Sequence, residues 1–173
     1  FVSDSMPSDL IGAICTLRHR SCDIALHFQS VGKMAHPQLW ANCNWIRIHK
    51  TEDTVKKHEV KFQSDVTHLF LAEKLVDIIY KGKLKKQYAK GGEVKADKRF
   101  FAYVDKDMKK VYGNFTKSMF HQAIESYLED NYTIVDKELK RRNIRTGELV
   151  HKDRAKAVES LISDYMKDYY GNR

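Results

Sequence analysis

The sequence has few residues that interrupt regular structure. Its 173 residues include 2 prolines and 8 glycines, which leaves little room for long flexible linkers. Its 3 cysteines, Cys15, Cys22 and Cys43, lack C-x-x-C spacing, and we expect them to be reduced thiols in an intracellular, cytoplasmic protein. No apolar run approaches the roughly 18 residues of a membrane-spanning helix. A signal peptide is also not recognisable.

A phosphate-binding loop is missing as well. Residues 27–34 read H-F-Q-S-V-G-K-M, and the Gly-Lys pair suggests the end of G-x-x-x-x-G-K-[ST]. His27 stands where the first glycine must turn the backbone, and Met34 stands where a hydroxyl must hold Mg²⁺. We therefore interpret this stretch as a chance similarity, and we do not expect the chain alone to bind ATP well.

The charge is strongly positive. Lys and Arg number 31 against 23 Asp and Glu, a net charge of +8. Such an excess favours an acidic partner, most often nucleic acid. The alternative is a basic domain without such a partner.

The order of expected elements predicts an α/β fold. F-V-S-D at the start is typical of the end of a buried strand, and Phe1 is not an initiator Met, so we expect an earlier part of the chain. A helix over 8–19, a strand over 23–28, a short helix opened by Pro37 and a strand over 45–49 follow. This alternation predicts a partial parallel sheet with crossover helices. Trp40 and Trp45 are expected in the core.

Three modules are predicted further along. Residues 1–80 would end with a polar helix over 51–62 and a stronger helix from Ser64 to about Tyr80. A basic linker over 81–98 contains Gly91-Gly92. Residues 99–173 would form a small, mainly helical α+β tail, with a hairpin and then helices over 116–130, 133–142 and 152–169.

Four short motifs in order resemble a known family. They are F-V-S-D-S, L-R-H-R, D-I-A-L-H-F-Q-S and H-P-Q-L-W-A-N. Together, over roughly residues 1–50, they resemble the second half of a P-loop ATPase of the FtsK–HerA superfamily. The most similar branch is the viral genome-packaging one, with poxvirus-type packaging ATPases and zonula-occludens-toxin-like phage proteins. The resemblance implies a P-loop ATPase core that here lacks its P-loop.

The resemblance also implies site residues. Asp4 would be the Walker B acid that holds Mg²⁺ through water, Gln29 a polar sensor, and Arg18 or Arg20 an arginine finger. Ser5 stands where the family has a second acid, which puts hydrolysis in doubt. Each position has a plainer interpretation: a loop acid, a surface amide, and cations that complement a helix dipole.

The implied function is ATP-driven translocation of double-stranded DNA, most plausibly viral genome packaging. ATP and Mg²⁺ would be the cofactors, and the partners would be DNA, a homo-oligomeric ring and a portal or capsid. The run 81–99 holds seven Lys and one Arg against one Glu and one Asp, and would follow the DNA backbone unless it is only a solvated loop. Its candidate lysines are Lys81, Lys83, Lys85, Lys86, Lys90 and Lys95.

Two other functions stay open. A metal-dependent nuclease is suggested by Asp53 with Glu59-Val60-Lys61, although two acids six residues apart on one helix share a face poorly. Asp105 and Asp107 are a weaker pair of the same kind. A non-enzymatic DNA-binding or assembly domain is favoured by the missing P-loop.

Overall fold

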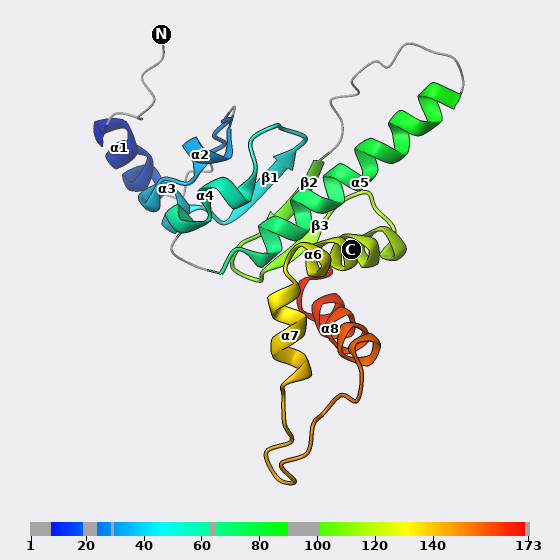
Figure 1. Ribbon diagram of the computed structural model, residues 1–173. Coiled ribbons are helices and arrows are strands. Elements are labelled where there is room, and N and C mark those ends of the chain that lie inside the picture. Colours follow the sequence, from blue (N-terminus) through cyan, green and yellow to red (C-terminus); the bar gives the residue numbers. More distant parts are fainter. Residues whose placement is uncertain (1–7, 19–23, 29, 63–64, 90–100, 172–173) are drawn as a thin grey trace.

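The computed structural model describes residues 8–18, 24–28, 30–62, 65–89 and 101–171. Helices and strands alternate in a mixed α/β arrangement (Figure 1). In chain order the elements are α1 (Ser8–Arg18), α2 (Val31–Met34), α3 (Pro37–Asn42), β1 (Trp45–His49), α4 (Val55–Phe62), α5 (Thr67–Ala89), β2 (Phe101–Asp105), β3 (Lys110–Tyr112), α6 (Lys117–Asp130), α7 (Tyr132–Leu139) and α8 (Arg154–Tyr169).

One antiparallel sheet joins the three described strands in the order β1-β2-β3. In the register, Trp45 faces Asp105 and His49 faces Phe101, while Tyr103 faces Tyr112 on the other side of β2. Because side chains alternate across a strand, one face of this sheet is apolar. Its buried residues are Ile46, Ile48, Ala102, Val104 and Val111.

Helix α5 covers the apolar face of the sheet and is the centre of the core (Figure 1). Leu69, Leu71 and Leu75 on this helix are completely buried. Helix α6 packs beside α5 and contributes Phe120 and Ile124 to the same core. A single hydrophobic cluster therefore holds residues from both sides of the predicted basic linker.

The mixed α/β class is confirmed, but a parallel sheet is not seen among the described residues. β1 was expected beside a parallel strand and instead pairs with β2 in the antiparallel direction. The strand expected over 23–28 is wrong for residues 24–28, which form no ladder and leave Ile24 and Leu26 about 40% exposed. A β-ladder requires a second strand, and the residue pattern of one short stretch does not show whether such a partner is available.

Helix boundaries also differ from those expected. The helix predicted over 51–62 begins only at Val55, after a turn in which the Asp53 backbone N–H donates to Thr51 Oγ1. The helix predicted to end near Tyr80 continues to Ala89, into the predicted linker. Lys, Leu, Gln and Ala are good helix formers, so this basic stretch extends the helix.

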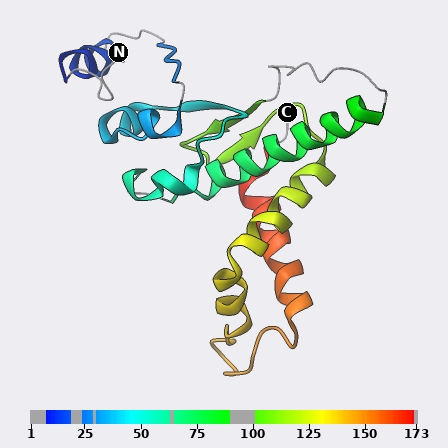
Figure 2. The ribbon, with the colours of Figure 1, turned by 45° about the horizontal axis from the view of Figure 1, so that its top comes forward.

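The predicted hairpin and the C-terminal helices are confirmed. Thr116 caps α6, because its Oγ1 accepts a hydrogen bond from the Met119 N–H at 3.2 Å. Asp153 caps α8 in the same way through the Lys156 N–H at 2.8 Å. Helices α7 and α8 pack together and project from the body as a pair (Figure 2). No helix in the described part of the chain combines the length and the apolar character needed to cross a membrane.

Candidate nucleic-acid interface

The face of the sheet that points away from α5 is aromatic and cationic. Alternation brings six side chains to it from three strands, each of them exposed or partly exposed. We call this the aromatic sheet face, and its residues are Trp45, Arg47, His49, Phe101, Tyr103 and Tyr112. Trp45 is 51% exposed, so the expectation that it lies in the core is wrong, whereas Trp40 is buried as expected.

Arg47 forms the centre of this face. Its guanidinium carbon lies 3.7 Å from the centroid of the Phe101 ring and 5.6 Å from that of Tyr103. The two rings are themselves packed edge to face, with centroids 5.1 Å apart. A cation over a ring face is attracted to the ring, and aromatic rings and Arg guanidinium planes are both groups on which unpaired bases stack.

Further rings extend the face in both directions. The Trp45 and Tyr112 centroids are 5.6 Å apart, and those of His49 and Phe101 are 5.8 Å apart. Gly171 packs closely against the Tyr112 ring, where an added Cβ would approach a ring carbon to 2.4 Å. Tyr112 is therefore partly covered, whereas Trp45 is 51% exposed.

Helix α5 carries a second set of cations beyond the sheet. Its C-terminal half extends past the sheet in both views (Figures 1 and 2). Four of the predicted DNA-binding residues lie on this half of the helix and are exposed: Lys81, Lys83, Lys85 and Lys86. Lys90 and Lys95 lie outside the described residues.

Most of the predicted ATPase positions fall where the structure gives no description. Asp4, Arg20 and Gln29 lie outside the described residues. Arg18 is the last residue of α1, and its side chain is not described. The structure therefore does not bring these positions together or separate them.

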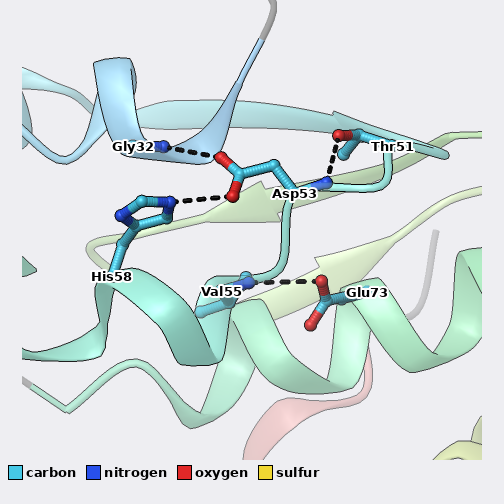
Figure 3. Close-up of polar contacts among 6 residues, drawn as sticks. All are labelled: Gly32, Thr51, Asp53, Val55, His58 and Glu73. Atoms are coloured by element: carbon cyan, nitrogen blue, oxygen red, sulfur yellow. Dashed lines mark hydrogen bonds and ion pairs between the residues drawn. The ribbon is translucent and has the colours of Figure 1, made fainter.

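The Ser-Val-Gly-Lys stretch has a structural role in the described residues. Val31–Met34 form the short helix α2, and the Gly32 N–H donates to Asp53 Oδ2 at 3.1 Å (Figure 3). His58 Nε2 lies 2.8 Å from the other carboxylate oxygen of Asp53. A Cβ on Gly32 would lie 2.6 Å from His58 Cε1, so only glycine leaves room for the His58 ring.

The pKa of Asp53 reflects the same contacts with Gly32 and His58. Partial burial raises the pKa of the carboxyl, but the Gly32 hydrogen bond and the His58 contact outweigh it and hold the pKa below its usual range. Both carboxylate oxygens thus have partners within the protein. Nearby, Glu73 Oε1 accepts from the Val55 N–H at 3.2 Å and ties the start of α4 to α5 (Figure 3).

The carboxylates of the nuclease alternative do not converge. Asp53 precedes α4 and contacts Gly32 and His58, while Glu59 lies exposed on that helix. Asp105 accepts from the Asp107 and Met108 N–H groups and so shapes the hairpin turn. Within the described ranges, no group of three or more His, Cys, Asp or Glu side chains is placed to hold a metal ion.

Comparison of the chain with protein-family models, with curated proteins and with solved structures found no match.

Sequence reasoning missed the aromatic sheet face, although a signal was present. In W-I-R-I-H the two Ile residues alternate with Trp45, Arg47 and His49, and in F-A-Y-V-D small or apolar residues alternate with Phe101 and Tyr103. In each strand the small or aliphatic residues at alternate positions fill the core. The residues between them, which are aromatic or charged, therefore face outward. The pairing of β1 with β2 was the step that sequence alone did not supply.

Proposed function

We propose that this chain binds nucleic acid, with unpaired bases on the aromatic sheet face and phosphates on the lysines of α5. The observation that carries the proposal is the solvent-facing stack of Arg47 on Phe101, at 3.7 Å, beside the exposed Trp45. Planar aromatic and guanidinium groups on an open sheet are the platform on which single-stranded nucleic acids stack.

Charge and size support the same partner. The net charge of +8 provides long-range attraction to phosphates, and the exposed lysines of α5 provide contacts that do not depend on base sequence. Strand β2, Phe101–Asp105, spans about 13 Å. That length accommodates about two or three stacked bases, as on other sheet surfaces that bind single strands.

A binding titration tests the proposal. Fluorescence anisotropy would compare a labelled single-stranded oligothymidylate with a duplex of the same length, each over a range of salt concentrations. We expect salt-sensitive binding of both, with the single strand about tenfold tighter because stacking adds to the phosphate contacts. Absence of binding at low salt would refute a nucleic-acid function, and equal affinities would refute stacking on the sheet.

A DNA-translocating ATPase is a second candidate, favoured by the four motifs within residues 1–50. In this proposal Asp4 and Gln29 would border the nucleotide, with Mg²⁺ and ATP between them and Arg18 or Arg20 as the finger. The aromatic sheet face would then serve as a DNA contact outside the nucleotide site. Double-stranded DNA, a ring of identical subunits and a viral portal or capsid would be the partners.

Two observations test the motor. A coding sequence that continues upstream of Phe1 should contain G-x-x-x-x-G-K-[ST]. The product of that longer gene should hydrolyse ATP, and Gln29→Ala should abolish turnover without weakening DNA binding. Turnover that survives Gln29→Ala would refute the sensor role.

A further inference from the structure

A small pocket lies beside the first turn of α5 and the turn between β2 and β3, and it shares no residue with the aromatic sheet face. Its volume is about 230 Å³, and it is lined by Trp40, Ala41, Asp65, His68, Lys106 and Lys109. These residues come from three places: the end of α3, the start of α5 and the turn between β2 and β3. We call it the His68 pocket.

His68 is the unusual member of this lining. The residue is only 1% exposed, yet neither ring nitrogen has a hydrogen-bond partner among the described residues. Its ring is stacked against Trp40 with centroids 6.3 Å apart, which fixes its plane. Leaving a buried polar group unpaired costs about 1–3 kcal/mol, so a histidine persists poorly here without a ligand for its nitrogens.

The protonation state of His68 follows from its surroundings. Burial lowers its pKa most, Asp65 opposes that effect, and Lys109 and Lys106 lower it further, to about 4. The imidazole is therefore neutral near pH 7 and offers one N–H donor and one acceptor nitrogen.

Two ammonium groups border the same space. Lys106 Nζ donates to the Trp40 and Ala41 carbonyl oxygens at 2.7 and 3.2 Å, which leaves a third N–H. Lys109 Nζ is 3.4 Å from Asp65 Oδ2, a long contact between two half-exposed side chains. With one carboxylate against two ammonium groups, the lining carries a net charge of +1 and favours an anion.

Helix α5 adds to this preference. The pocket lies at the first turn of this 23-residue helix, where the dipole is positive. Asp65 already caps the turn, because its Oδ1 accepts from Thr67 N–H at 3.0 Å and from Thr67 Oγ1 at 2.7 Å. The side chain of Asp65 is therefore held in place, while the buried His68 and the two lysines remain for a ligand.

We propose that the His68 pocket binds a phosphate group, with the His68 N–H and the Lys106 and Lys109 ammonium groups as donors. The cavity is several times the volume of one water molecule, so a phosphate has room within it. Neutral apolar ligands would leave the lysines and the imidazole unsatisfied. The phosphate can come from inorganic phosphate or from the end of a nucleic-acid strand.

Nitrogen-15 NMR of the imidazole rings tests this directly. In a buffer without phosphate or sulfate, the probes are inorganic phosphate, a 5′-phosphorylated thymidine dinucleotide and the same dinucleotide without that phosphate. We expect phosphate, the phosphorylated dinucleotide or both to shift the His68 ring signals saturably, and the unphosphorylated dinucleotide to leave them unchanged. Whichever phosphate binds identifies the source.

Substitutions distinguish a specific phosphate site in the His68 pocket from non-specific binding of anions. Lys109→Gln, at an exposed turn where folding is little affected, should weaken phosphate binding about tenfold, since hydrogen bonds to charged groups contribute about 1.5–3 kcal/mol. Lys137→Gln, which replaces an exposed lysine on α7, is the matched control and should leave phosphate affinity unchanged. His68→Phe should also weaken binding. No shift of the His68 signals with any phosphate, or equal affinity in wild type, Lys109→Gln and His68→Phe, would overturn the proposal and leave water in the pocket.

Discussion

The Arg47 guanidinium carbon lies over the Phe101 ring of the neighbouring strand, 3.7 Å from its centroid, on the side of the sheet that faces solvent. A residue that only kept the sheet soluble would leave this cation free in water. Here the guanidinium is held over the Phe101 ring before any ligand arrives. Such preorganisation lowers the entropy cost of stacking a base on it.

Arg47→Lys separates the charge of this residue from its planar shape. Lysine keeps the positive charge but cannot stack as a plane. We expect single-strand affinity to fall about tenfold with an unchanged slope of log affinity against log salt, whereas Arg47→Ala should lower both. Salt titrations by anisotropy measure this. Full affinity in Arg47→Lys would mean that Arg47 acts only as a charge.

The exposed lysines of α5 should act through phosphates alone. Lys81 and Lys85 lie four residues apart and so share one side of the helix. We expect Lys81→Gln with Lys85→Gln to reduce the magnitude of the salt slope by about 1.4 for single strands, equally for different base sequences. The double variant Lys137→Gln with Lys140→Gln, on and just after α7, is the control. An unchanged slope would place the nucleic acid away from α5.

Gly32 and Gly82 should respond in opposite directions to alanine. A Cβ on Gly32 would displace the His58 ring and break its contact with Asp53, whereas a Cβ on Gly82 meets nothing within 4 Å. We expect Gly32→Ala to lower the free energy of unfolding by about 1 kcal/mol and Gly82→Ala, inside α5, to raise it by about 0.5–1 kcal/mol. Urea denaturation measures both. Stabilisation by Gly32→Ala would show that the His58–Asp53 contact contributes little.

Asp53→Asn should destabilise the protein in a pH-dependent way. The pKa of Asp53 is lower in the folded chain than its ordinary 3.8. Its carboxylate therefore stabilises the fold above that pKa, and this contribution is lost as the pH falls through the folded value. We expect the gap in unfolding free energy between wild type and Asp53→Asn to be largest near pH 7 and to close below about pH 4. Asp164→Asn, exposed on α8, is the control, and a gap that persists at acid pH would contradict the assignment.

The sequence indicated local elements better than their pairing. Helical periodicity and the Thr116 cap located α6 closely, because both signals lie within one segment. The partner of β1 was not predictable in the same way, since Trp45–His49 pairs with Phe101–Asp105, more than fifty positions later in the sequence. Nothing in either strand alone specifies whether its neighbour runs parallel or antiparallel.

The candidate site was missed for the same reason. Trp45 was expected in the core because large apolar residues are usually buried, and only the register with β2 places it beside an open face. The lysines of α5 were predicted from the basic composition of residues 81–99, and that prediction does not depend on which strands pair. The His68 pocket, assembled from three separate segments, left no pattern in the sequence.

Tryptophan fluorescence tests the central claim most directly, because the chain has 2 Trp residues and one of them, Trp45, is exposed on the aromatic sheet face. Oligothymidylate should quench the Trp45 emission saturably. Trp45→Phe should abolish that quenching while keeping most of the affinity, since Phe still stacks. Trp45→Ala should weaken binding by about tenfold, whereas Tyr132→Ala, an exposed ring on α7, should leave it unchanged. If the oligonucleotide binds without quenching Trp45, or if Trp45→Ala and Tyr132→Ala bind equally well, the aromatic sheet face is not where the nucleic acid lies.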